Sequence, residues 1–235
     1  TIDFSHLQIT LGGGAAVQQA VAERWKTATG VTLVEAYGLT ETSPGAVINP
    51  LNLKEYNGCI GLPIPSTEVI LRDDSGAEVG IGIPGEICIR GPQVMKGYWN
   101  KPEETAKVID RAGWLATGDV GVVDEKGFFK IVDRKKDMVL VSGFNVYPNE
   151  VEAIVAMMPG VLECAVIGVP DDKTGEAVKV CIVKKDPNLT AEDVLAHCRV
   201  HLTGYKIPRH VAFRSELPKT NVGKILRREL REQEK

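Results

Sequence analysis

Residues whose types and spacing could support chemistry are concentrated between positions 113 and 152. This segment, GWLATGDVGVVDEKGFFKIVDRKKDMVLVSGFNVYPNEVE, places Asp119, Arg134, Lys136 and Gly143 on consecutive short strands and turns. An aspartate at a strand end can accept two hydrogen bonds from a vicinal diol, as on a ribose. An arginine after the next strand can hold another part of the same ligand by forked donation. We therefore expect this segment to bind a ligand that contains a diol.

A second motif, YGLTET, occupies positions 37–42 and directly follows an expected strand. The ring of Tyr37 can stack on a base. The hydroxyl of Thr40 can reach a phosphate oxygen, and the carboxylate of Glu41 can bind Mg²⁺ directly or through water. A capping-type turn is the structural alternative. The residue types favour a site for a nucleotide and its metal ion.

A glycine-rich turn, Gly12-Gly13-Gly14-Ala15, lies between an expected strand and an expected helix. Glycines let the backbone approach a flat ring, and the amides at a helix start attract anions. By itself the turn is more typical of a plain connection between the two elements.

These motifs, together with PKTNVGK at positions 218–224, resemble the C-terminal part of an adenylate-forming acyl-CoA synthetase and occur in that family's order. The segment at 113–150 is most similar to the bacterial long-chain fatty-acid–CoA ligases. GPQVMKGYWN at 91–100 and LPKTNVGKILRREL at 217–230 point to the same subgroup. The resemblance covers the whole chain.

The resemblance implies a role for each motif residue in binding nucleotide. It assigns the glycine-rich turn to the adenine pocket, YGLTE to the base, phosphates and Mg²⁺, and TGD and the following arginine to the ribose. The residues concerned are Gly13, Gly14 and Ala15 for adenine, Tyr37, Gly38 and Thr40 for ATP, Glu41 for Mg²⁺, and Asp119 and Arg134 for ribose.

The resemblance also implies roles in catalysis and transfer. Lys224 matches the catalytic lysine, whose ammonium can bridge the substrate carboxylate and the α-phosphate. Lys136 matches the hinge residue, whereas Lys135 has a solvated turn as its alternative. Gly143 matches the corner that leaves room for the pantetheine arm of coenzyme A. Many relatives that act on acetate carry a basic residue where this chain has Asn145.

The implied activity is a ligase that converts a long-chain fatty acid and MgATP to acyl-AMP and then transfers the acyl group to coenzyme A. ATP, Mg²⁺ and coenzyme A are the expected cofactors. Alternatives are an aryl or medium-chain carboxylate–CoA ligase and a non-catalytic nucleotide-binding module. We expect a cytoplasmic protein that does not bind nucleic acid. Peripheral association with the inner membrane and homodimer formation are open alternatives for a full-length parent.

The expected fold is α/β followed by α+β. Residues 1–133 form the C-terminal portion of a large domain, with an αβ piece at 1–57 and a β-rich, barrel-like subdomain at 58–133. Residues 134–235 form a small, mobile α+β domain. Expected strands include Glu68–Arg72, Gly85–Arg90 and Val120–Asp124. Expected helices include one that ends at Gly30, one capped by Asn100, and one that begins with a capping box of Thr190 and Asp193.

Composition places the chain among ordinary globular proteins. It has 235 residues, 43% hydrophobic and 25% charged, with a net charge of −3. Five widely spaced cysteines without a CxxC pair indicate reduced core thiols. The pattern GxGxxG at Gly80–Gly85 is followed by a strand and contains a proline, so it is interpreted as a turn.

The family's phosphate loop, rich in Ser, Thr and Gly, is absent from these 235 residues. The expectation is therefore a C-terminal fragment of a longer enzyme, without the cradle for the β- and γ-phosphates. We expect this fragment to be inactive by itself.

Overall fold

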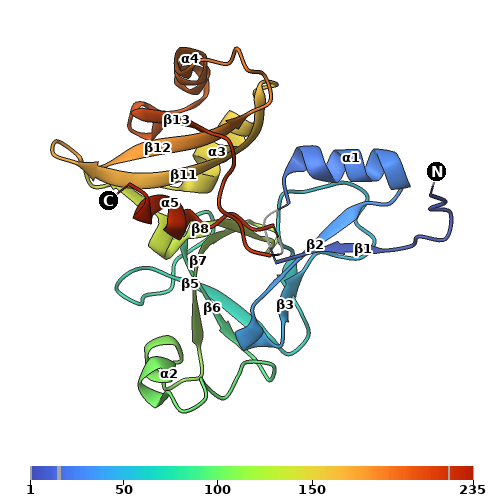
Figure 1. Cartoon of the computed structure of the whole chain (residues 1–235). Coiled ribbons are helices and arrows are strands. Elements are labelled where there is room, and N and C mark those ends of the chain that lie inside the picture. Colours follow the sequence, from blue (N-terminus) through green and yellow to red (C-terminus); the bar gives the residue numbers. More distant parts are fainter. Residues whose placement is uncertain (1, 15–16, 222, 235) are drawn as a thin grey trace. The chain divides into compact units, whose positions relative to one another are not determined.

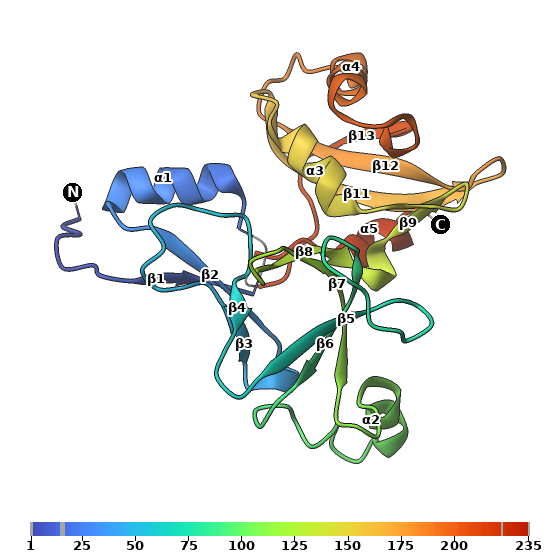
Figure 2. The same cartoon turned by 180° about the vertical axis from the view of Figure 1, so that it is seen from behind.

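The computed structural model of the chain describes residues 2–14, 17–221 and 223–234 and divides into two compact units, Thr1–Val132 and Asp133–Lys235. Figures 1 and 2 show the elements of each unit from opposite sides. The boundary lies one residue before the expected one, because the side chain of Asp133 is buried among groups of the second unit.

The first unit begins with an αβ piece built on a four-stranded sheet in the order β1-β2-β3-β4. Strands β1 and β2 are parallel and are joined by α1, whereas β3 and β4 add antiparallel strands. The bounds are β1 Thr10–Gly12, α1 Gln19–Thr29, β2 Leu33–Gly38, β3 Gly45–Ile48 and β4 Leu62–Pro63. Gly30 ends α1 with a left-handed φ of 75°, as its position after the last helical residue predicted.

The β-rich part of the first unit is a four-stranded sheet in the order β5-β6-β7-β8. Its elements are β5 Glu68–Arg72, β6 Gly85–Arg90, α2 Pro102–Val108, β7 Leu115–Val123 and β8 Phe129–Arg134, whose last two residues belong to the second unit. The predicted bounds of β5 and β6 are confirmed. No pairing that would close this sheet into a barrel is present among the described residues, so the barrel-like form remains a prediction.

Two details of this sheet differ from expectation. Residue Asn100 does not cap α2: it has a left-handed φ of 53°, which asparagine tolerates, and Lys101 occupies the cap position. Strand β7 begins at Leu115, five residues before its predicted start, so Asp119 lies inside the strand rather than at its end. Gly118 has a φ of 74° and interrupts the alternation of side chains, so the sequence pattern did not predict the first part of this strand.

The core of the first unit joins its two sheets. Its buried members come from β2, β3, β5, β6, β8 and the segment before β4, namely Tyr37, Ala46, Val47, Ile60, Leu71, Ile87, Ile89 and Phe129. Tyr37 is thus a core residue as well as a candidate ligand contact.

The second unit is an α+β layer structure around the sheet β10-β9-β12-β11, with β13 pairing β12. Its elements are β9 Val139–Val141, β10 Phe144–Val146, α3 Pro148–Ala156, β11 Val161–Asp171, β12 Gly175–Lys184, α4 Ala191–His201, β13 His210–Arg214 and α5 Arg227–Glu232. The capping box of Thr190 and Asp193 that was predicted for α4 is present.

Alternate residues of β11 and β12 pack on opposite faces of this sheet, as the period of two requires. Cys164 and Val166 belong to a core cluster with residues of α3 and α4, whereas Ala165 and Ile167 belong to a cluster with Leu230 of α5. The C-terminal helix is therefore held by apolar contacts to one face of the sheet, the face opposite α3 and α4 (Figure 2).

Candidate functional site

In the first unit the structure brings two candidate residues into direct contact. The hydroxyl of Tyr37 on β2 donates a 2.7 Å hydrogen bond to Oδ2 of Asp119 on β7. Both side chains are 8% exposed. The predicted base-stacking and diol-binding residues therefore lie side by side although 82 positions separate them.

Each member of this pair lies next to an irregularity of its strand. The β6–β7 register shifts between Glu86 and Cys88, and Gly118 has a φ of 74°, so β7 bulges just before Asp119. The β2–β3 register shifts between Tyr37 and Gly38. Bulges redirect side chains out of the regular alternation, which explains how residues on two different sheets can meet.

Gly38 is required by a close approach of the backbone. A Cβ atom at this position would lie 1.6 Å from the carbonyl oxygen of Pro44. Any larger residue would push apart the turn that follows β2, and this turn contains the short 3-10 helix Thr40–Thr42. Gly38 thus shapes the segment that presents Thr40, which is exposed, and Glu41, which is half-buried.

Glu41 is the candidate ligand for Mg²⁺. The hydroxyl of Tyr98 donates a 2.9 Å hydrogen bond to its Oε1 atom, and the same bond raises the pKa of Tyr98. Throughout residues 2–14, 17–221 and 223–234, no cluster of three or more His, Cys, Asp or Glu side chains could hold a metal ion. A single carboxylate nevertheless suits Mg²⁺, which keeps several waters and takes the rest of its ligands from substrate phosphates.

The glycine-rich turn is only partly described. Gly13 and Gly14 are exposed, and Gly14 has a φ of 79°. Ala15, the third predicted adenine contact, lies outside the described residues. A Cβ atom on Gly14 would meet nothing within 4 Å, whereas one on Gly13 would lie 3.1 Å from the carbonyl oxygen of Ala36. Gly14 thus presents the open backbone that close approach of a ring requires.

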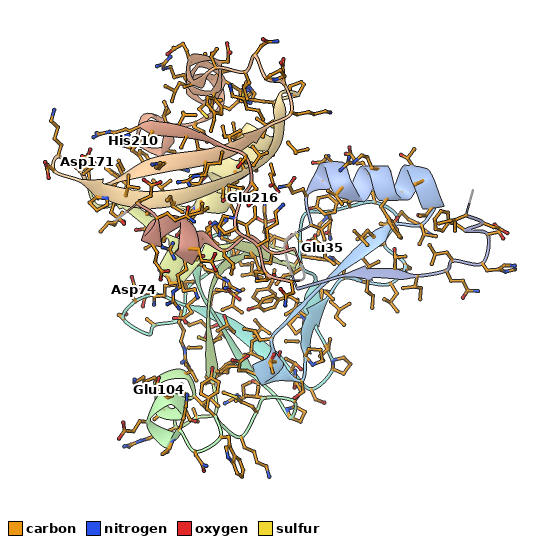
Figure 3. All side chains as sticks on the ribbon, in the orientation of Figure 1. Glu35, Asp74, Glu104, Asp171, His210 and Glu216 are labelled. Atoms are coloured by element: carbon orange, nitrogen blue, oxygen red, sulfur yellow. The ribbon has the colours of Figure 1, made fainter. Side chains whose placement is uncertain are left out.

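Sequence reasoning missed Glu35, which orders the far end of this turn. It is 7% exposed, and its Oε1 atom accepts a 3.2 Å hydrogen bond from the amide of Val17. Burial raises the pKa of Glu35. Figure 3 labels it on the αβ piece. A carboxylate within the otherwise apolar strand LVEAYG was the signal that could have revealed it.

In the second unit, Arg134 and Lys136 belong to one short segment. Arg134 ends β8, and Lys136 lies in the 3-10 helix Lys135–Asp137 that follows. Lys136 is exposed, whereas the flanking Asp133 and Asp137 are buried. Two buried carboxylates thus enclose three cations, of which Lys135 and Lys136 are exposed and Arg134 is half-buried.

Gly143 forms the corner between β9 and β10. Ser142 and Gly143 both have left-handed φ values, 51° and 85°, as a two-residue hairpin turn requires. A Cβ on Gly143 would meet nothing within 4 Å. The amide of Ser142 donates to the carbonyl of Thr174, so the neighbouring hairpin holds the corner in place.

Lys224 lies at the end of a tight turn. Its amide donates a 3.1 Å hydrogen bond to Oγ1 of Thr220, and the amide of Thr220 donates to the carbonyl of Lys224. Leu226 closes the turn by donating to the carbonyl of Pro218. Backbone hydrogen bonds therefore hold Lys224 within the turn, and the residue is half-buried.

Within the first unit, the candidate residues Tyr37, Glu41 and Asp119 lie on β2, in the turn after β2 and on β7. Side chains of these types can stack on a base, bind a metal ion and accept hydrogen bonds from a diol. Within the second unit, the candidates Lys224 and Gly143 lie in a turn and at a hairpin corner. The described helices include none that is long and apolar enough to cross a membrane.

Two segments of the chain match models of known protein families. Residues 1–99 match the model of the AMP-binding enzyme family, and residues 150–224 match the model of the AMP-binding enzyme C-terminal domain. A long-chain-fatty-acid–CoA ligase of Yersinia pestis is 62% identical over 99% of the chain, and a feruloyl-CoA synthase of Amycolatopsis sp. is 45% identical over 97%.

Among solved structures, ATP-bound MatB from Rhodopseudomonas palustris aligns with a TM-score of 0.91 and 36% identity. The alignment covers 96% of this chain and 45% of MatB. The chain spans 41% of the length of the Yersinia pestis relative and 47% of the feruloyl-CoA synthase.

Proposed function

The chain belongs to the AMP-binding enzyme family, and on that premise we propose that it carries the nucleotide-binding and acyl-transfer residues of an AMP-forming fatty-acid–CoA ligase. The observation that supports the proposal most directly is the 62% identity over 99% of the chain to a long-chain-fatty-acid–CoA ligase. The contact between Tyr37 and Asp119 is consistent with it, because a base platform and a ribose acceptor must be adjacent.

The first half-reaction joins a fatty acid to AMP. A carboxylate oxygen attacks the α-phosphorus of ATP, and pyrophosphate leaves. In the proposal, Tyr37 stacks on the adenine beside the turn at Gly13, Gly14 and Ala15, while Asp119 and Arg134 bind the ribose hydroxyls. Gly38 and Thr40 border the phosphates. Bound Mg²⁺, held through Glu41, would neutralise phosphate charge.

Lys224 supplies the positive charge of this step. Its ammonium would bridge the attacking carboxylate and the α-phosphate, where negative charge accumulates in the transition state. A lysine at the end of an ordered turn can be delivered to this position and withdrawn again without unfolding its surroundings. The role predicts that removal of the side chain affects the first half-reaction alone.

The second half-reaction transfers the acyl group to coenzyme A. We propose that the second unit rotates about Lys136, withdraws Lys224 and brings the corner at Gly143 to the acyl-AMP. The absence of a side chain at Gly143 would leave space for the pantetheine arm. The thiol sulfur then attacks the acyl carbon and AMP leaves.

We further propose that the 235 residues alone do not turn over. The sequence contains no phosphate loop rich in Ser, Thr and Gly, and the curated relatives are more than twice as long as the matched portion. The complete gene product is proposed to be cytoplasmic, with peripheral membrane association and homodimer formation as open alternatives.

A second candidate is an aryl-CoA ligase, which the 45% identity to a feruloyl-CoA synthase favours. A non-catalytic nucleotide-binding module is the third candidate.

One experiment separates the three candidates. It measures pyrophosphate release and acyl-CoA formation by the complete gene product with palmitate, decanoate and ferulate. We expect the highest kcat/KM with palmitate. A preference for ferulate would support the aryl-CoA ligase, and no turnover with any acid would support the non-catalytic module.

A further inference from the structure

A buried ion cluster connects three segments of the second unit. We define the cluster as Asp133 and Asp137 at the end of β8 and in the following 3-10 helix, Glu152 on α3, and Arg227 and Arg231 on α5. No residue of this cluster has a part in the chemistry proposed above. Its members nevertheless lie next to residues that do.

Arg227 is the centre of the cluster. Its Nε and Nη2 atoms donate to the two carboxylate oxygens of Glu152, at 3.0 and 2.7 Å. Nη2 also donates to Oδ1 of Asn149 at 2.6 Å, and Nη1 lies 3.4 Å from Asp133 and 3.5 Å from Asp137. One planar guanidinium thus contacts three carboxylates and an amide, a geometry that lysine cannot reproduce.

The carboxylates of the cluster have little access to water. The side chains of Asp133 and Asp137 are 0% and 8% exposed, and that of Glu152 is 15% exposed. Burial raises the pKa of Asp133 and of Glu152, and the charge of Arg227 opposes the rise in both. The charge of Arg227 therefore favours the ionised form of Asp133 and Glu152.

The cluster also fixes its own backbone. Asp133 accepts hydrogen bonds from the amides of Arg134 and Asn149, at 2.7 and 2.6 Å. Glu152 accepts one from the amide of Val166 on β11 at 2.7 Å. A guanidinium bound to these carboxylates is therefore anchored to β8, α3 and the central sheet at once.

Arg227 lies close to Lys224 in the chain and contacts the segment that contains Lys136. Arg227 is the first residue of α5 and follows Lys224 by three positions, directly after Leu226 closes the lysine turn. Two of the carboxylates that Arg227 contacts, Asp133 and Asp137, flank Arg134 and Lys136 in the sequence. Arg227 therefore ties the turn that carries Lys224 to the segment that carries the hinge residue.

We propose that Arg227 is a positioning residue that holds the Lys224 turn against Asp137 and Glu152, which both follow Lys136 in the chain, so that rotation about Lys136 delivers Lys224 in one fixed orientation. The inference rests on the proposed function and deepens it. Gly143 lies between β9 and β10, outside the contacts of Arg227. Loss of the anchor should therefore impair the first half-reaction and spare the second.

The test uses Arg227→Lys in the complete gene product, because lysine keeps the charge that the buried carboxylates need but loses the forked donors. Adenylation is measured by pyrophosphate release, and transfer is measured from pre-formed acyl-AMP. We expect adenylation kcat to fall on the order of 100-fold with KM values nearly unchanged, since small misplacements of a reacting group cost about this much. Transfer should fall less than about threefold.

A matched control is the neighbouring Arg228→Lys. Arg228 lies on the same helix and pairs with Glu232, but its side chain is 84% exposed. This variant should leave both half-reactions unchanged. A second variant, Glu152→Gln, removes one charged acceptor of Arg227 and should show the same one-sided loss, on the order of tenfold. It provides the test if Arg227→Lys does not fold, which thermal melting would reveal.

The outcomes are distinct. A loss confined to adenylation, with Arg228→Lys normal, supports the inference. Equal losses in both half-reactions, or no loss in either, overturn it and leave the cluster as a stabilising element only. A wild-type protein that catalyses neither half-reaction overturns the proposed function, and the inference with it.

Discussion

The hydroxyl of Tyr37 and the carboxylate of Asp119 are joined by a 2.7 Å hydrogen bond between two sheets of the first unit. The bond restrains the orientation of the carboxylate. A residue of the core thus orients a residue of the candidate site.

Replacement of Tyr37 by phenylalanine should destabilise the first unit by about 1 kcal/mol, because the buried acceptor on Asp119 loses its donor. Urea unfolding of the 235-residue chain measures the change. The control is Tyr98→Phe, whose hydroxyl bonds to Glu41 at a more exposed place and should matter less. A Tyr37→Phe chain as stable as wild type would mean that the bond contributes nothing.

Lys224→Ala should reduce adenylation in the complete gene product on the order of 100-fold or more, because a charge that stabilises the transition state is lost. Transfer from pre-formed acyl-AMP should be nearly unchanged. The control is Lys219→Ala, since Lys219 lies on the same turn but is exposed and pairs with Glu163. Equal losses in the two half-reactions would argue against the assignment of Lys224.

Lys136→Pro should restrict φ at the proposed hinge and trap one orientation of the second unit. One half-reaction should then survive while the other fails. Lys136→Ala, which removes the side chain but not the backbone freedom, should retain both. If the proline variant is normal in both steps, the rotation has its pivot elsewhere.

The pH dependence of stability should report on Asp171, at the tip of the hairpin that supports the Gly143 corner (Figure 3). The hydroxyl and amide of Thr174, the amide of Lys173 and Arg209 lower the pKa of Asp171 to about 2. A lowered pKa means stability that is present above the ordinary value of 3.8 and is lost as the pH falls toward 2.

Thermal melting of wild type and Asp171→Asn at several pH values measures this effect. We expect wild type to melt at the higher temperature at pH 5, and the difference to disappear near pH 2. A difference that is independent of pH would contradict the proposed origin of the stability.

The isolated 235-residue chain should bind ATP weakly, with a Kd on the order of 1 mM or worse, equivalent to about −4 kcal/mol. The groups expected to bind ATP are the glycine-rich turn, Tyr37 and Asp119. They contact the adenine and the ribose rather than the β- and γ-phosphates. Calorimetry should find similar affinities for ATP and AMP, and no pyrophosphate should be released with palmitate. Micromolar affinity for ATP clearly above that for AMP, or turnover, would contradict the fragment interpretation.

The sequence by itself determined the features that depend on neighbouring residues. The bounds of β5 and β6, the glycine after α1 and the capping box of Thr190 and Asp193 each involve groups within a few positions, and each is present. The motif residues were likewise recognisable because the spacing within YGLTET and PKTNVGK is local.

Only the tertiary structure decided the relations that join distant segments. The bond from Tyr37 to Asp119 spans 82 positions, and that from Arg227 to Asp133 spans 94. The bulge before Asp119 follows from the pairing of β7 with β6, which local alternation does not encode. Glu35 and Arg227 gained their importance from burial, and burial is a property of the packed chain rather than of any segment within it.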